Sequence, residues 1–88
     1  MYKIYYTNRM KKDIRRAQKS GRDISKLTEV LNLLQTGEPL PEKYDDHNLK
    51  DFRECHIESD WLLLYKIFED ELILSATATG SHSYIFGK

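Results

Sequence analysis

The feature that most constrains the fold of this chain is a nearly continuous apolar run from Trp61 to Phe68. A run of this length and composition is typical of a strand that is buried on both faces of a sheet. Such a strand lies inside a sheet, so other segments must pair with it on both sides. Its longest uninterrupted part, Trp61 to Tyr65, is far shorter than a membrane span requires. We therefore expect a central strand here and no association with a membrane.

Three further segments have strand character. Tyr2–Thr7 is rich in aromatic and β-branched residues, and Leu72–Thr79 follows an acidic turn at Glu69–Glu71. Phe52–Ile57 alternates between two kinds of side chain. These segments supply the neighbours that the central strand needs.

The alternation within Phe52–Ile57 assigns its side chains to two faces. Cys55 and Ile57 suit a core, and Arg53 shares their face. His56 then belongs to the opposite face, which a substrate could reach.

Two amphipathic helices are predicted between the first and second strands. In the first, Met10, Ile14 and Ala17 recur at helical spacing, and Ser20-Gly21 ends the helix. The second helix ends at Gly37. Its apolar stripe consists of Ile24, Leu27, Val30, Leu31 and Leu34.

The predicted order of elements is β-α-α-β-β-β, with a polar loop from Glu38 to Lys50. This order predicts an α+β fold in which two N-terminal helices pack on a small, mainly antiparallel sheet. A chain of 88 residues is expected to form a single domain, residues 1–88. The single cysteine forms no internal disulfide, and the first residues have no apolar signal core, so we expect a cytoplasmic protein.

The net charge of zero conceals an uneven distribution of charge. Residues 1–26 carry nine basic and two acidic residues, a net +7, whereas residues 27–60 carry three basic and nine acidic residues, a net −6. One interpretation is that the basic segment binds a polyanion. The other is that it is a solvated helix face that pairs with the acidic middle of the same chain. Charge alone does not separate the two.

The three histidines, His47, His56 and His82, all lie in the second half of the chain, where a single sheet could bring them together. Imidazole is the side chain best suited to moving protons near neutral pH. Cleavage of RNA needs one group to activate the ribose 2′-hydroxyl and another to protonate the leaving 5′-oxygen. Two histidines can serve as base and acid, and a carboxylate such as Asp60 can orient an imidazole or accept a proton. No metal is required for this reaction, and no cofactor is expected.

Each of these residues also has an ordinary structural explanation. His47 could be a solvated loop residue, His82 part of a tail, and Asp60 the cap of a turn. Trp61 is more easily explained as core than as a platform for a base. A metal site built from the histidines and Asp60 is a weak alternative, because no pair has the local spacing of metal ligands.

Taken together, four motifs resemble the YafQ-type toxins of the RelE/ParE superfamily of bacterial toxin–antitoxin systems. The motifs are Asp46-His47-Asn48-Leu49, Arg53-Glu54-Cys55-His56-Ile57, Asp60-Trp61-Leu62-Leu63-Leu64-Tyr65-Lys66, and Gly80-Ser81-His82 through Phe86-Gly87. The resemblance covers nearly the whole chain and implies a RelE-like fold. Glu54 departs from it, since the family usually has Asp at this position.

The resemblance implies a ribosome-dependent endoribonuclease, an mRNA interferase, that cleaves mRNA in the decoding site. It identifies His47, His56, Asp60 and His82 as catalytic residues, with Trp61 and Phe86 in support or in contact with substrate. His82 is expected to be the general acid and His47 or Asp60 the general base. Arg53, together with His56, is expected to stabilise phosphate charge, provided that strand twist or a bulge brings it to the His56 face.

The resemblance also implies binding partners. A cognate antitoxin protein would hold the toxin inactive and would bind operator DNA for the complex. The ribosome, through 16S rRNA, and mRNA would be the nucleic-acid partners. The residues expected to face ribosomal RNA are Lys11, Lys12, Arg15, Arg16 and Lys19.

Two rival interpretations remain at this stage. The same fold also occurs in gyrase-poisoning toxins, which act without such a set of histidines, so this chain could be a non-catalytic toxin or an antitoxin-binding module. The third interpretation is a metal-dependent hydrolase, whose activity a chelator would abolish. The set of three histidines favours the interferase.

Overall fold

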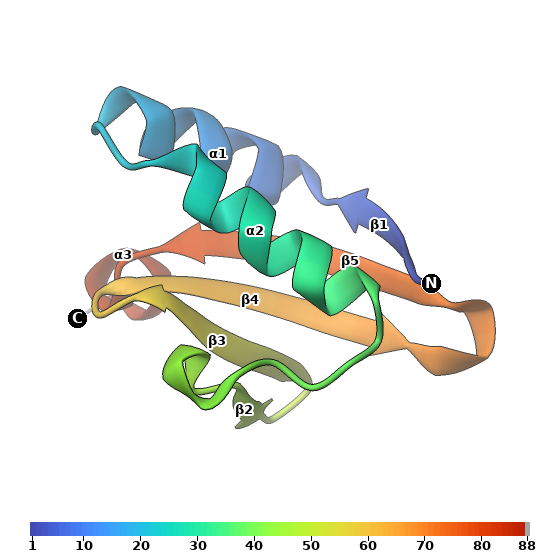
Figure 1. The fold of residues 1–88 in the computed structure, drawn as a ribbon. Coiled ribbons are helices and arrows are strands. Elements are labelled where there is room, and N and C mark those ends of the chain that lie inside the picture. The colour runs from blue at the N-terminus through green and yellow to red at the C-terminus, as the bar shows by residue number, and fades with distance from the viewer. Residues whose placement is uncertain (88) are drawn as a thin grey trace.

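A five-stranded sheet in the order β1-β5-β4-β3-β2 forms the centre of the structure, a computed structural model that describes residues 1–87 (Figure 1). Strand β1 runs parallel to β5, and the other neighbouring pairs are antiparallel. The predicted α+β class is confirmed. The elements are β1 (Lys3–Tyr6), α1 (Asn8–Lys19), α2 (Ile24–Gln35), β2 (His47–Leu49), β3 (Phe52–Glu58), β4 (Trp61–Phe68), β5 (Ile73–Gly80) and α3 (His82–Phe86), with 3-10 turns at Glu42–Tyr44 and Glu69–Glu71.

The prediction of a polar loop from Glu38 to Lys50 is wrong in part. It contains the 3-10 turn at Glu42–Tyr44 and the edge strand β2, which pairs with β3 through His47 opposite Glu54. A three-residue strand is too short for its alternation to be recognised in a sequence. Lys50, with φ of 54°, forms the left-handed turn that returns the chain into β3.

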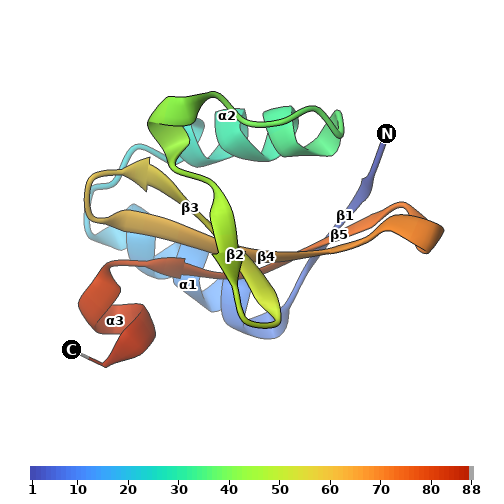
Figure 2. The same cartoon turned by 90° about the horizontal axis from the view of Figure 1, so that it is seen from below.

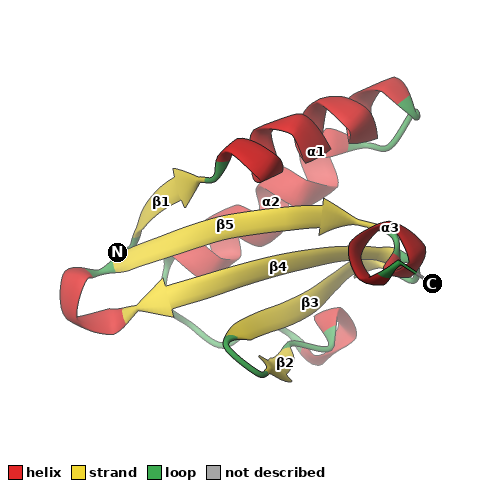
Figure 3. Ribbon diagram, turned by 180° about the vertical axis from the view of Figure 1, so that it is seen from behind, coloured by secondary structure: helices red, strands yellow, loops and turns green. Residues whose placement is uncertain are grey.

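The short helix α3 was also absent from the predicted order of elements. Ser81 caps it, since its hydroxyl accepts a hydrogen bond from the Tyr84 backbone N–H at 3.1 Å. Helices α1 and α2 cover one face of the sheet, and α3 lies on the other face at the end of β5 (Figures 2 and 3). The structure thus adds a third helix on the face where His56 was expected.

The core lies between the sheet and helices α1 and α2. It combines the predicted apolar stripes of both helices with one face of β3, β4 and β5, and Cys55 and Ile57 belong to it as predicted. Burial raises the pKa of the Cys55 thiol to about 12, so this thiol stays protonated and unreactive. Strand β4 is buried on both faces, because Trp61, Leu62 and Leu63 are each 0% exposed.

The register of β4 determines which residues of its two neighbours meet. Leu62 lies between His56 of β3 and Gly80 of β5, and Leu64 lies between Glu54 and Ala78. All six residues therefore share the face opposite α1 and α2. Because Gly80 sits across from His56, the chain that continues into α3 starts beside that histidine.

A buried carboxylate connects three elements at this end of the sheet. Asp13 of α1 is 1% exposed, and it accepts hydrogen bonds from the Thr79 backbone N–H at 3.1 Å and the Tyr84 hydroxyl at 2.6 Å. The Arg9 guanidinium lies 3.6 Å from the same carboxylate. Asp13 therefore joins α1 to the end of β5 and to α3.

None of the helices in residues 1–87 is both long and apolar enough to cross a membrane.

We expect Asp13→Ala to lower the free energy of unfolding by about 1–3 kcal/mol, because the buried Thr79 N–H loses its acceptor. Tyr84→Phe, which removes one partly exposed bond, should cost only about 0.5–1.5 kcal/mol. Urea unfolding followed by the fluorescence of Trp61 measures both effects. Asp70→Ala, in the exposed turn before β5, is the control. Equal stability of the Asp13 and Asp70 variants would show that Asp13 does not connect these elements.

Candidate active site

The structure brings the three histidines together in a row on the open face of the sheet. His47 comes from β2, His56 from β3, and His82 from the first residue of α3. The ring centroids of His47 and His56 are 6.4 Å apart, and those of His56 and His82 are 5.6 Å apart. His56 is thus the middle ring of the row, with one imidazole on each side. We call these residues, with their two carboxylate partners Glu54 and Asp60, the histidine cluster.

Glu54 is the buried carboxylate of the histidine cluster, and sequence reasoning did not assign it a role. It is 5% exposed, and its Oε1 lies 3.2 Å from His47 Nε2 and 3.6 Å from His56 Nε2. Its position two residues before His56 on the same strand was the signal that could have identified it. One carboxylate oxygen therefore contacts two of the three imidazoles.

The hydrogen bonds of His47 define which of its nitrogens can act as a base. Its Nδ1 lies 2.7 Å from the backbone carbonyl of Asp45, and a carbonyl only accepts, so Nδ1 carries a proton. The remaining nitrogen, Nε2, faces Glu54. Nε2 is therefore the nitrogen of His47 that can accept a proton.

Asp60 holds His82 in place at the other end of the row. One carboxylate oxygen accepts hydrogen bonds from both the His82 backbone N–H and the ring Nδ1, each at 3.1 Å. The backbone bond, then the ring bond, lowers the pKa of Asp60 below its ordinary value. Asp60 is therefore an anion at neutral pH that orients the imidazole and secures the start of α3.

Arg53 lies away from the histidine cluster, on the face of the sheet that α1 and α2 cover. It shares this face with Tyr65, its partner across the strands, and the bulge between His56 and Glu58 comes too late in β3 to move it. The structure therefore does not bring Arg53 to the His56 face. The expected role of Arg53 in stabilising phosphate charge required it to reach that face, so this role is not supported.

Arg53 instead anchors the segment that leads into β2. Its guanidinium donates to Asp46 at 2.8 Å and to Asn48 at 2.6 Å, and the Tyr65 hydroxyl also donates to Asp46. Burial, followed by the Asp46 contact, raises the pKa of Tyr65, so its hydroxyl keeps its proton. Because Asp46 and Asn48 flank His47, this network fixes the strand that carries His47.

Trp61 and Phe86 occupy different environments. Trp61 is 0% exposed, and its indole N–H donates to the Thr79 hydroxyl at 2.9 Å, so it supports the site from within. Phe86 is exposed, with its ring centroid 6.1 Å from that of His82. Only Phe86 of the two is placed to contact a substrate.

The basic residues expected to face ribosomal RNA all lie exposed on α1. Within residues 1–87, the ion pairs of the basic N-terminal segment join Arg9 to Asp13 and Lys26 to Glu58. Within the described residues, the pairing of this segment with the acidic middle of the chain is therefore limited to the ion pair of Lys26 with Glu58. Four of the five expected residues, Lys11, Lys12, Arg15 and Lys19, are exposed and form no ion pair within residues 1–87, whereas Arg16 lies over the ring of Tyr84.

Comparison with known proteins identifies the family. The family described as bacterial toxin of type II toxin–antitoxin system, YafQ, matches residues 2–87. The mRNA interferase toxin YafQ of Escherichia coli (strain K12) is 38% identical over 89 residues, spanning 96% of this chain and 95% of that protein. This chain belongs to the YafQ family of type II toxins, and the predicted relationship to endoribonucleases of the mRNA interferase class is confirmed.

Two solved structures share the fold closely. A metal-bound toxin from Helicobacter pylori superposes with a TM-score of 0.92 at 41% identity, covering 98% of this chain and 100% of that one. YafQ in the DinJ–YafQ complex of E. coli superposes with a TM-score of 0.88 at 36% identity, covering 99% of this chain and 100% of that one.

The lowered pKa of Asp60 predicts how its contact with His82 responds to acid. Because the pKa is lower in the folded state, the contact contributes stability above the unfolded-state pKa and is lost only as the pH falls through the folded-state pKa. Carbon-13 NMR of the Asp60 carboxyl should give a titration midpoint below that of an ordinary aspartate. In His82→Ala the midpoint should rise only part of the way, since the backbone N–H remains. An ordinary midpoint in the unmodified protein contradicts the assignment.

Proposed function

We propose that this chain is an mRNA interferase toxin that cleaves mRNA in the decoding site of the ribosome by acid–base catalysis without a metal. The observation that carries the proposal is the row of imidazoles from His47 through His56 to His82. A phosphate placed over the middle ring has a proton-transfer group on each side, as the attack of a 2′-hydroxyl on its own phosphate requires. The names of the E. coli relatives support the same substrate.

The geometry favours His47 over Asp60 as the general base. The lowered pKa of Asp60 makes it a weak base, and its oxygen is already occupied by two hydrogen bonds from His82. His47 offers Nε2, which lies 3.2 Å from Glu54, so a proton accepted by Nε2 has a carboxylate beside it. His47 therefore accepts the proton of the 2′-hydroxyl, with Glu54 as its proton partner.

His82 acts as the general acid and His56 stabilises the crowded phosphorane between the two end rings. Asp60 fixes the orientation of the His82 ring, so that its free nitrogen, Nε2, is the one that protonates the leaving 5′-oxygen. His56 contacts Glu54 at 3.6 Å and Asp45 at 3.8 Å, so two carboxylates lie near this ring when it is protonated. The products are a 2′,3′-cyclic phosphate and a 5′-hydroxyl.

The partners in this proposal are the ribosome, mRNA and an antitoxin. The exposed cations of α1 would contact 16S rRNA phosphates, which gives an affinity that falls with salt. The DinJ–YafQ structure supports a cognate antitoxin as the inhibitor, and operator DNA would be bound through that antitoxin. These partners are cytoplasmic.

The first test compares single alanine variants at His47, His56, Asp60 and His82 for cleavage of a defined mRNA on programmed 70S ribosomes, read by primer extension. Loss of a general acid or base should lower kcat by about 10²- to 10⁴-fold. Ser83→Ala, an exposed change next to His82 on α3, should retain activity. Full activity in all four variants would refute the mechanism, whereas cleavage by the unmodified protein without ribosomes would refute ribosome dependence. DNA-damage signalling without mRNA cleavage would favour a gyrase poison.

A second candidate property of the same cluster is the binding of a transition metal. One ligand atom each from Glu54, His56 and His82 lie within 4.8 Å of one another, and two imidazoles with a carboxylate suit Zn²⁺ or Cu²⁺. The Helicobacter pylori relative is described as metal-bound. A metal held there would engage His56 and His82, two of the residues that the acid–base mechanism uses.

We therefore expect metal to inhibit the enzyme. Protein treated with chelator, then freed of it before addition to ribosomes, should cleave at the full rate, and prior loading with Zn²⁺ should lower the rate. His47→Ala, which leaves the three ligands intact, should still bind Zn²⁺ in calorimetry, whereas His56→Ala should not. Activity that disappears after chelation and returns with Zn²⁺ would instead establish a metal-dependent hydrolase.

A further inference from the structure

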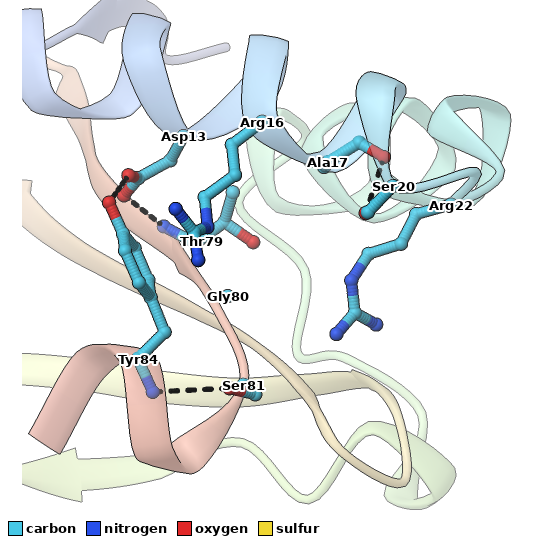
Figure 4. Close-up of a pocket in the computed structure, with 9 residues that line it drawn as sticks. All are labelled: Asp13, Arg16, Ala17, Ser20, Arg22, Thr79, Gly80, Ser81 and Tyr84. Carbon is cyan, nitrogen blue, oxygen red and sulfur yellow. Dashed lines mark hydrogen bonds between the residues drawn. The ribbon is translucent and has the colours of Figure 1, made fainter. Parts of the chain in front are cut away.

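A cavity of about 190 Å³ lies beside the histidine cluster, between α1, the end of β5 and α3 (Figure 4). Polar and charged side chains line much of it, and the guanidinium groups of Arg16 and Arg22 point toward the strand end at Gly80 from two directions (Figure 4). Pockets that enclose a drug-sized ligand are larger, at roughly 300–1,000 Å³. The cavity therefore suits a small anionic group.

Both arginines are held by aromatic rings. Arg16 lies over the ring of Tyr84 at 4.5 Å, and Arg22 lies over the ring of Trp61 at 5.1 Å. Stacking fixes the plane of a guanidinium and leaves its N–H edges free to bind phosphate in a bidentate manner. Within residues 1–87, Arg22 donates one bond, to the Asp60 carbonyl at 3.3 Å, and neither arginine forms an ion pair.

The one carboxylate that lines this cavity does not cancel the two positive charges. Asp13 already accepts hydrogen bonds from Thr79 and Tyr84 and lies 3.6 Å from Arg9. Its charge is therefore balanced by groups outside the arginine pair. An anion that enters the cavity meets two guanidinium groups and the hydroxyls of Ser20 and Ser81, which also line it.

Asp60 links the lining of the cavity to the histidine cluster. Its backbone carbonyl accepts from Arg22, and its carboxylate holds His82. Gly80 forms the boundary, and a side chain there would place a Cβ 2.5 Å from Cδ2 of Tyr84. The cavity with its two arginines therefore lies directly beside His82, since Gly80 and Ser81, the two residues before it, line the cavity.

We propose that this cavity binds a phosphodiester of the mRNA adjacent to the one being cut, with Arg16 and Arg22 as its ligands. The inference rests on the proposed function, because it places the scissile phosphate over His56. It reassigns Arg16 from ribosomal RNA to the messenger strand and adds Arg22, which no motif indicated. The subsite holds the chain on the leaving-group side of His82 and so fixes which bond lies between the end histidines.

The first experiment maps binding of a 2′-O-methyl RNA trinucleotide, which has no nucleophile and is not cleaved. In nitrogen-15 NMR we expect the Nε–H signals of Arg16 and Arg22 and the Ser81 amide to shift together with the ring signals of His56 and His82. Shifts of the histidines alone would overturn the subsite and leave the proposed function standing. Shifts of the arginines alone, or no shift at all, would overturn the inference, and with it the placement of RNA on the histidines.

The second experiment separates the messenger strand from ribosomal RNA as the source of the phosphate. On programmed ribosomes Arg22→Ala should raise KM by roughly tenfold or more with little change in kcat, and Arg22→Lys should recover part of the loss. The slope of log kcat/KM against log salt concentration should become shallower by about the amount expected for one phosphate contact. Lys3→Ala, an exposed change on β1 far from α3, is the matched control (Figure 3).

Binding to empty 70S ribosomes completes the test. Arg22→Ala should bind them as tightly as the unmodified protein does, since the proposed phosphate is absent. An equal loss of affinity for empty ribosomes would assign the cavity to ribosomal RNA and overturn the inference. Because Arg22 also covers Trp61, its loss could disturb the fold, and Arg16→Ala serves as an independent variant. If both variants are folded and both keep the KM of the unmodified protein, the inference is overturned.

Discussion

The whole arrangement depends on the burial of β4 on both faces. A strand with two apolar faces must lie inside the sheet, between two neighbours. The register of β3 against it is specified by the two different faces of β3, because a shift by one residue would exchange Cys55 with His56. The observed register sets His56 and Gly80 on either side of Leu62. It thereby aligns two segments that are 24 residues apart in the sequence, counted from 56 to 80. The position of the histidines is thus a consequence of hydrophobic burial, because the packing of the core fixes the strands that carry them.

Carboxylates that are buried or half-buried then turn this frame into a site of defined shape. Asp13 joins α1 to α3, Asp46 ties the segment before β2 to β3 and β4, and Glu54 lies between two imidazoles. Within residues 1–87, every buried side-chain nitrogen and oxygen has a hydrogen-bond partner. A buried charge is tolerated only with partners of this kind, so each carboxylate constrains the elements that supply them. The site is rigid where it orients its histidines and open where a strand of RNA would pass.

The elements predicted from the sequence are those long enough to show a pattern of apolar residues, and the elements that were missed are short. The helices and β4 were predicted because their apolar residues repeat over several turns or fill a whole strand. Strand β2 and helix α3 have three and five residues, too few for any period, although they carry His47 and His82. The histidines themselves were identified by residue type and motif. The alternation of β3 already placed Arg53 on the face opposite His56, and the structure agrees. The burial of Glu54 and the contact of Arg22 with Asp60 depend on packing between distant segments, which a single sequence does not contain.

The parallel pairing of β1 with β5 has a consequence for when the histidine cluster is completed. Lys3 pairs with Ile73, and α1 packs against β5, so the first elements to be synthesised wait for the last strand before they find their place. Closing so long a stretch of chain costs entropy that only the complete sheet repays. A product of interrupted synthesis that stops before β5 would contain His47 and His56 but neither the sheet that aligns them nor His82. The complete histidine cluster therefore exists only in finished chains.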